Sequence, residues 1–139
     1  MISWPRTREE FVWYQGFMQG RGKIRVSDTA HFLSWLRDNT PVWVVAFDNW
    51  MGYTCQLSMA ATQCYVPKAF RKAVFNYAFN VLKRKRVYAL VEASNEAALR
   101  LDKWLGFKEF HRAPECTLNG GDIVMLELTA EVGLAKHVA

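Results

Sequence analysis

The sequence predicts an α/β fold with a mixed central sheet, and two observations carry that prediction. Residues 60–66, 68–83 and 87–91 form an apolar run, an amphipathic stretch and a second apolar run, which is the order of a strand, a helix and a strand. Such a crossover places its two strands parallel in one sheet. Residues 42–47 and 53–59 are β-branched and aromatic and flank a turn, which indicates an antiparallel hairpin.

Length and composition favour a single domain over residues 1–139. The chain has 139 residues, 51% of them hydrophobic, which is enough for one core. No stretch approaches the roughly 18 uninterrupted apolar residues of a membrane helix. Residues 1–8 also lack the charged and apolar regions of a secretion signal. We therefore expect the protein in the cytoplasm.

Capping signals predict the first elements. Residues 1–4 suit a short strand, and Thr7 and Glu10 form a capping box that begins a helix after Pro5. The apolar positions of this helix include Phe11, Tyr14 and Met18. The Gly-Arg-Gly sequence at residues 20–22 ends it.

A second helix is predicted before the first long strand. Ser27 and Asp28 offer an N-cap, and residues 39–41, Asn-Thr-Pro, stop the segment. Its apolar positions are Phe32, Leu33 and Leu36. We thus expect two helices to precede the hairpin.

The second half of the chain alternates helices and strands. Polar residues recur every fourth position from Lys68 to about Lys83, which predicts a helix with a narrow exposed stripe. Residues 87–91 are continuously apolar, as in a central strand covered on both faces. Asn95 caps a further helix, closed by Gly106 in a left-handed conformation.

The chain is predicted to end in an antiparallel pair. Residues 107–112 and 123–128 suit strands, and they flank Asn119-Gly120-Gly121. This tripeptide is a strong turn signal.

Charge and cysteine content narrow the classes of ligand. Eighteen basic against thirteen acidic residues give a formal net charge of +5. This excess suits an anionic ligand such as a nucleotide cofactor, and it also suits a surface that is simply solvated. The three cysteines, Cys55, Cys64 and Cys116, lack metal-ligand spacing and indicate reduced thiols, so no metal is expected.

One stretch resembles a known family. The segment is Val87-Tyr-Ala-Leu-Val-Glu-Ala-Ser-Asn95-Glu-Ala-Ala-Leu-Arg-Leu-Asp-Lys-Trp-Leu-Gly106-Phe107. It is similar to the strand, the helix-opening Asn and the closing Leu-Gly-Phe of the GCN5-related N-acetyltransferases (GNAT). Residues 65–79 look like the matching segment of short acetyltransferase-like proteins encoded by bacteriophages. The resemblance covers about residues 42–128.

The resemblance implies a GNAT-like mixed central sheet with splayed parallel strands and helices on both faces. It also implies acetyl-CoA as the acyl donor, with the pantetheine arm between residues 60–66 and 87–92. The pyrophosphate would lie at the N-terminus of the helix that begins at Lys68, where free N–H groups and the helix dipole favour an anion. The residues expected to bind the cofactor are Tyr65, Val66, Lys68, Phe70, Arg71, Lys72, Ala73 and Asn95.

The phosphate loop departs from the family pattern. The family's phosphate loop follows a Gln/Arg-x-x-Gly-x-Gly/Ala pattern, but this chain has no glycine between Gly52 and Gly106. With Arg71 in the first position, Val74 and Asn76 replace the small residues and would crowd the phosphates. Asn95 also has a purely structural explanation as a helix cap.

The catalytic candidates are two acidic residues, a tyrosine and a histidine. Glu92, at the carboxyl end of the central strand, is the best candidate for a general base, with a charged strand end as the alternative explanation. Asp102 takes the position of the family's Tyr acid, and a carboxyl group donates a proton at neutral pH only if burial raises its pKa. Tyr65 and His31, the latter on the predicted second helix, are further candidates.

The sequence thus leaves two functions open. One is an acetyl-CoA-dependent N-acyltransferase acting on an amine of a protein or small molecule. The alternative is a catalytically inactive phage protein of the same fold, with a virion-structural or host-protein-binding role. Residues 83–86, Lys-Arg-Lys-Arg, fall at a helix C-terminus, where cations are favoured structurally, so nucleic acid is not expected as a partner. Whether the protein forms a homodimer stays open.

Overall fold

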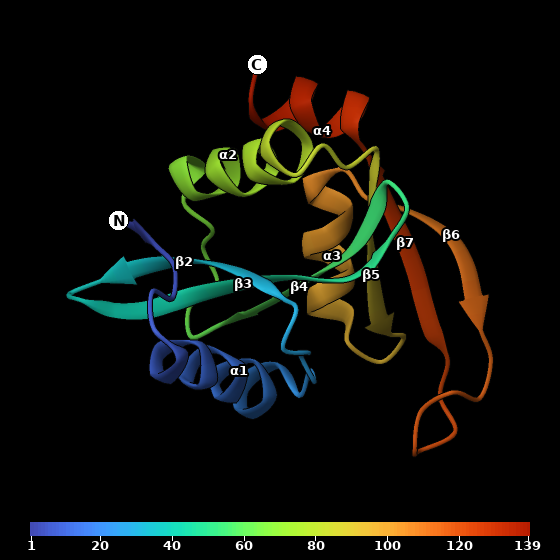
Figure 1. The fold of residues 1–139 in the computed structure, drawn as a ribbon. Helices are drawn as coiled ribbons and strands as arrows, with labels where there is room; N and C mark the ends of the chain where they lie inside the picture. Colours follow the sequence, from blue (N-terminus) through green and yellow to red (C-terminus); the bar gives the residue numbers. More distant parts are fainter.

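The computed structural model describes residues 1–139 and shows one seven-stranded mixed sheet with helices on both faces (Figure 1). In chain order the elements are β1 (Ile2–Ser3), α1 (Arg8–Gly22), β2 (His31–Arg37), β3 (Thr40–Met51), β4 (Thr54–Ala61), α2 (Lys68–Asn76), the π-helix η1 (Tyr77–Val81), β5 (Arg86–Glu92), α3 (Glu96–Leu105), β6 (Lys108–Ala113), β7 (Ile123–Thr129) and α4 (Ala130–His137). None of the helices is both long and apolar enough to span a membrane.

The strand order is β1-β2-β3-β4-β5-β7-β6. Only β4 and β5 pair in parallel, and every other neighbouring pair is antiparallel. The parallel pair is the crossover predicted through α2, and β6 with β7 is the predicted antiparallel pair at the end of the sheet. The predicted α/β class with a mixed sheet is therefore confirmed.

Two predicted elements were wrong. The second helix does not exist, because residues 31–37 form strand β2, paired with β1 and β3. Residues 60–66 are not a separate strand, because β4 runs continuously through residue 61 and the chain then leaves the sheet. The hairpin strand and the strand before the crossover are therefore the same element. Helix α4 was not predicted.

The sheet separates two cores. On one face Tyr14 and Met18 of α1 pack against Val44, Ala46 and other small or aromatic side chains of the sheet. On the other face α2, η1, α3 and α4 cover a larger core of 20 buried residues. Successive β3 residues alternate between the two cores, as the pleat of a strand requires.

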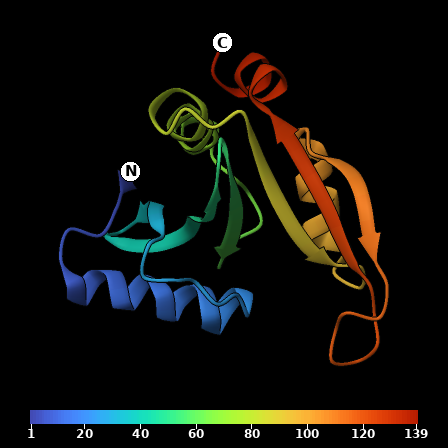
Figure 2. The same ribbon diagram turned by 45° about the vertical axis from the view of Figure 1, so that its right-hand side comes forward.

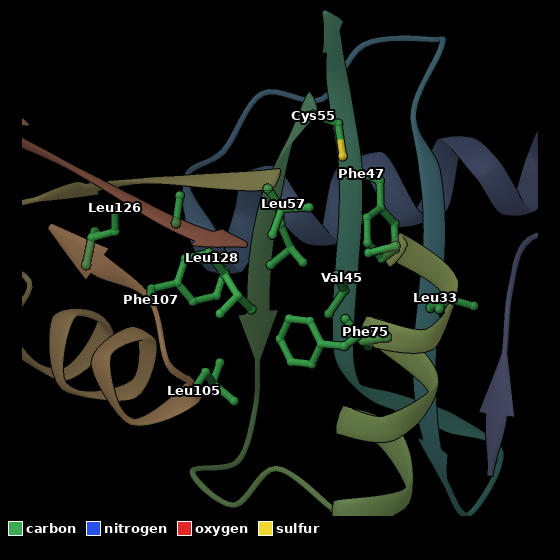
Figure 3. Packing of buried hydrophobic residues seen from close by; sticks show 14 of the residues in the cluster. Leu33, Val45, Phe47, Cys55, Leu57, Phe75, Leu105, Phe107, Leu126 and Leu128 are labelled. Atoms are coloured by element: carbon green, nitrogen blue, oxygen red, sulfur yellow. The ribbon is translucent and has the colours of Figure 1, made fainter. Parts of the chain in front are cut away.

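The larger core fixes the positions of α2 and α3. Phe75 projects from α2 toward the sheet, where Val45 and Leu57 lie, and Leu105 and Phe107 fill the other side of the same core (Figure 3). Phe75 and Leu105 are each 1% exposed. Burial of this extent anchors both helices against β4 and β5, the two strands that form the site described next.

Candidate functional site

Strands β4 and β5 separate soon after they begin. Their parallel register covers only Thr54 with Arg86, Cys55 with Val87, and Gln56 with Tyr88. Beyond these pairs the strands diverge, and the C-terminal end of α1 lies at the opening (Figure 2). The predicted splay of two parallel strands is therefore present, with β4 in the place of residues 60–66.

The splay leaves backbone groups free on both strands. The Thr62 amide donates to the Val42 carbonyl in β3, so by strand alternation the backbone groups of Met59 and Ala61 point the other way, into the splay. The Ala61 carbonyl accepts from Arg21, which leaves the Ala61 amide and both groups of Met59 for a ligand. On β5, the Ala93 amide donates to Asp122, which turns the backbone of Leu90 toward β4. An extended ligand with amide groups therefore finds donors and acceptors along both edges.

A cleft of about 820 Å³ occupies the splay. Its walls are residues 57–61 of β4, residues 89–92 of β5, one side of α3 and residues 21–24 at the end of α1. Because α3 and α1 lie on opposite faces of the sheet, residues from both faces line the cleft.

Three of the residues predicted from the sequence line this cleft together: Glu92, Asn95 and Asp102. Glu92 is the last residue of β5 and is exposed. Asn95 begins α3, and its side-chain oxygen accepts a hydrogen bond from the Ala98 amide at 3.2 Å. The cap and the cleft are compatible, because Asn95 is exposed and its amide nitrogen stays available.

Asp102 is the buried acid of the cleft. Its side chain is 6% exposed, and no hydrogen bond or ion pair engages its carboxyl group. Burial raises the pKa of Asp102 to about 7, because the charged form loses its hydration. At neutral pH the group is therefore protonated in a large fraction of molecules and can donate a proton.

The N-terminus of α2 offers two free amides. The amides of Phe70 and Arg71 both donate to the Pro67 carbonyl at 3.0 Å, and no side chain caps the helix. The amides of Lys68 and Ala69 precede these bonds and have no intrahelical acceptor, as at any helix start. Lys68 and Lys72 are exposed and add positive charge.

The other residues expected to bind the cofactor do not line the cleft. Val66 and Phe70 are 6% and 1% exposed and belong to the large core, so their side chains offer no surface to a ligand. Ala73 lies in the second turn of α2. Tyr65 is 69% exposed, and its carbonyl accepts the Trp43 indole N–H at 2.7 Å.

Arg71 packs between helices instead of forming part of a loop. Its guanidinium lies 4.7 Å from the ring centroid of Trp104 on α3, and its Nε is buried without a partner. The expected phosphate loop at residues 71–76 is helical, and Val74 is 3% exposed in the core. Crowding of phosphates by Val74 was therefore a wrong expectation, since that side chain points away from any ligand.

His31 lies outside the cleft. It begins β2, and its Nδ1 forms a hydrogen bond of 2.6 Å with the Tyr77 hydroxyl of η1. Its ring also packs edge-on against Trp50. Its placement on a helix was wrong.

Sequence reasoning missed Arg21 and Lys23. Both line the cleft from the end of α1, and the Arg21 guanidinium donates to the Ala61 carbonyl through Nε at 3.4 Å and Nη2 at 3.3 Å. In the sequence they flank Gly22, which indicates only a helix end. The sequence does show the positive charge of Arg21 and Lys23 at the end of the first helix. A single sequence does not show, however, that these residues lie next to β4.

Solved acetyltransferase structures share this fold. A chimera of the spermidine N-acetyltransferase SpeG from Vibrio cholerae and hSSAT has a TM-score of 0.75 at 13% identity, covering 96% of this chain and 99% of that chain. Mutant forms of the spermidine/spermine N-acetyltransferase SpeG from Vibrio cholerae give 0.72 at 14%, covering 96% of each chain. A ribosomal-protein alanine acetyltransferase from Vibrio fischeri gives 0.62 at 15%, covering 73% of this chain and 62% of that chain.

The chain therefore has the GNAT fold, in which its structural neighbours are N-acetyltransferases. No protein-family model and no curated protein matches the sequence. Identities of this order establish the fold, and the function has to be argued from the cleft.

Proposed function

We propose that residues 1–139 form a single acyltransferase domain that moves an acetyl group from acetyl-CoA to an amine. The observation that carries the proposal is the cleft through the splay, with free backbone groups on both strands. A pantetheine arm is a flexible chain with two amides and would pair with the backbone of Met59 and the amide of Ala61 on β4 and with Leu90 on β5. The donor and the acceptor would then meet from opposite faces of the sheet.

The phosphates of acetyl-CoA would lie near the N-terminus of α2. The Lys68 and Ala69 amides and the positive end of the helix dipole favour an anion there, and Lys68 and Lys72 add charge. A helix N-terminus binds an anion without glycine, so the glycine-free segment does not exclude binding. Without a wrapping loop there are fewer amide contacts, and we expect modest affinity.

The chemistry needs one base and one acid. The amine nitrogen attacks the thioester carbonyl carbon, its proton passes to Glu92 directly or through water, and the C–S bond then breaks. The departing thiolate takes a proton from Asp102, which burial keeps protonated near neutral pH. Glu92 and Asp102 both line the cleft, from its strand wall and its helix wall.

The proposal is tested by calorimetric titration with acetyl-CoA, CoA and adenosine bisphosphate. Ala98 lies on the cleft wall of α3, so Ala98→Trp should fill the cleft and weaken acetyl-CoA binding at least about tenfold, the effect of losing roughly 1.4 kcal/mol. Lys103→Trp places the same side chain on an exposed position of α3 outside the cleft and should leave affinity unchanged.

Absence of binding at millimolar acetyl-CoA would contradict the proposal and favour a non-catalytic phage protein of this fold. Equal affinity for acetyl-CoA and adenosine bisphosphate would show that the pantetheine arm contributes nothing, and would reject the splay as its site. Because the structural neighbours include spermidine acetyltransferases, a polyamine is one acceptor to be compared.

A further inference from the structure

The acceptor side of the cleft carries an uneven distribution of charge. On the face of the sheet covered by α1, the charged residues that line the cleft are Arg21 and Lys23 at the helix end and Glu92 at the end of β5. Ile24 and Leu90 line the cleft alongside them. A ligand here meets two positive side chains, an apolar wall and one carboxylate.

The other acidic side chains near this face have partners already. Asp28 pairs with Arg8 at 3.3 Å, and Asp48 accepts hydrogen bonds from the Ser27 amide at 2.8 Å and hydroxyl at 2.6 Å. Glu127 on β7 pairs with Arg86 at 3.1 Å. Asp28 and Glu127 are thus paired with arginines, and the oxygens of Asp48 are occupied by donors of the protein, so none of the three pairs with Arg21 or Lys23.

Arg21 and Lys23, by contrast, have no carboxylate partner. Arg21 uses Nε and Nη2 on the Ala61 carbonyl, which holds its guanidinium at the edge of the splay and leaves Nη1 free. Lys23 sits in a left-handed conformation as the C-cap of α1, so the helix end fixes its backbone. Both cations are held at the opening with donors to spare.

Resting on the proposed function, we propose that the acceptor is a small primary amine that also carries an anionic group, a carboxylate or a phosphate. Arg21 and Lys23 bind the anionic group, and Glu92 receives the amine at the other side of the opening. Arginine suits either anion, because its planar donors match both geometries. A diamine of similar length places a second cation against Arg21 and Lys23 and is repelled.

Release of free CoA thiol measures acceptor choice, with four amines of similar length: γ-aminobutyrate, O-phosphoethanolamine, putrescine and n-butylamine. We expect kcat/KM for at least one of the two anionic amines to exceed that for n-butylamine about tenfold, and putrescine to be the poorest acceptor. The two anionic amines distinguish a carboxylate site from a phosphate site.

Variants test the assignment to two residues. Arg21→Gln with Lys23→Gln should raise KM for the anionic amine about tenfold or more, raise KM for n-butylamine far less, and remove the discrimination against putrescine. Arg25→Gln is the matched control: it removes a positive charge two positions from Lys23, outside the cleft, and should leave KM unchanged.

The outcomes separate the inference from the proposed function. Acetyl-CoA binding with fastest transfer to putrescine or n-butylamine would overturn the inference and leave the acyltransferase standing. An equal effect of Arg25→Gln would show a general effect of net charge and also overturn it. No acetyl-CoA binding would reject both proposals together.

Discussion

Two buried aspartates show how local contacts set the behaviour of one residue type. Burial tends to raise the pKa of Asp48, but hydrogen bonds from Ser27 and Thr29 outweigh this, and its pKa lies below the ordinary value. Asp102 has a similarly small exposed surface, but it lies deeper in the protein and lacks such donors, so burial raises its pKa to about 7. Only Asp102 holds a proton where catalysis would need one.

The proton on Asp102 predicts a pH dependence of activity. An acid must be protonated, so its contribution to kcat is present below a pH of about 7 and is lost above it. Asp102→Asn cannot donate in this way and should lower kcat about a hundredfold at low pH. The ratio of wild-type to variant kcat, measured at saturating amine, should fall as pH rises through 7. A constant ratio would show that Asp102 does not act as the acid.

The same residue predicts a pH dependence of stability. A carboxyl group whose folded pKa is raised from 3.8 to about 7 binds more protons when folded, so the free energy of unfolding falls as pH rises between these values. The upper bound is on the order of 4 kcal/mol. Urea unfolding at pH of about 5 and about 8 should therefore show wild type losing stability relative to Asp102→Asn. An unchanged difference between the two proteins would mean that burial does not shift this group.

At the scale of elements, the sequence predicted most helices and strands but assigned β2 to the wrong class. Helix α3 was predicted with its cap and its glycine end, because Asn95 and Gly106 are local signals. Strand β2 was predicted as a helix, because Phe32 faces α1 while Leu33 faces α2, so both faces are apolar and no alternation remains. Ser27 does not cap a helix, because its amide donates a hydrogen bond to the Asp48 carboxylate instead.

Sequence reasoning found one part of the candidate site and missed the other. Glu92, Asn95 and Asp102 belong to one continuous segment with a family resemblance, and the structure brings all three to the cleft. Arg21 and Lys23 reach the cleft from a segment about seventy residues earlier in the chain, and only the packing of α1 onto β3 and β4 places them there. Such long-range placement has no signal in a single sequence.

Glycines in two helices predict opposite effects of the same substitution. A Cβ on Gly133 of α4 would collide with the ring of Phe79 in η1, so Gly133→Ala should destabilise the protein by about 1–3 kcal/mol. A Cβ on Gly16 of α1 meets nothing within 4 Å, so Gly16→Ala should stabilise it by about 0.5–1 kcal/mol. Thermal unfolding of both variants compares them directly. Stabilisation by Gly133→Ala would contradict the docking of α4 on η1.

At the scale of the whole molecule, the sheet consists of two antiparallel parts joined by one short parallel ladder. β1 to β4 form one part and β5, β7 and β6 the other, and only three register pairs connect them. The large core beneath both parts, with Phe75 at its centre, keeps them together where the strands do not. Across the opening, the helices therefore supply contacts between the two parts where the strands are not paired.

Alternate backbone amides of β4 should therefore exchange with deuterated solvent at two different rates. The amides of Ser58 and Ala60 bond to β3 and should be protected, while those of Met59 and Ala61, between them in the chain, face the splay and should exchange quickly. A pantetheine arm bound along β4 would slow only the second set. If exchange alternates along β4 without ligand and becomes uniformly slow with acetyl-CoA, the affected amides show where the acyl donor binds. This measurement does not require a known acceptor.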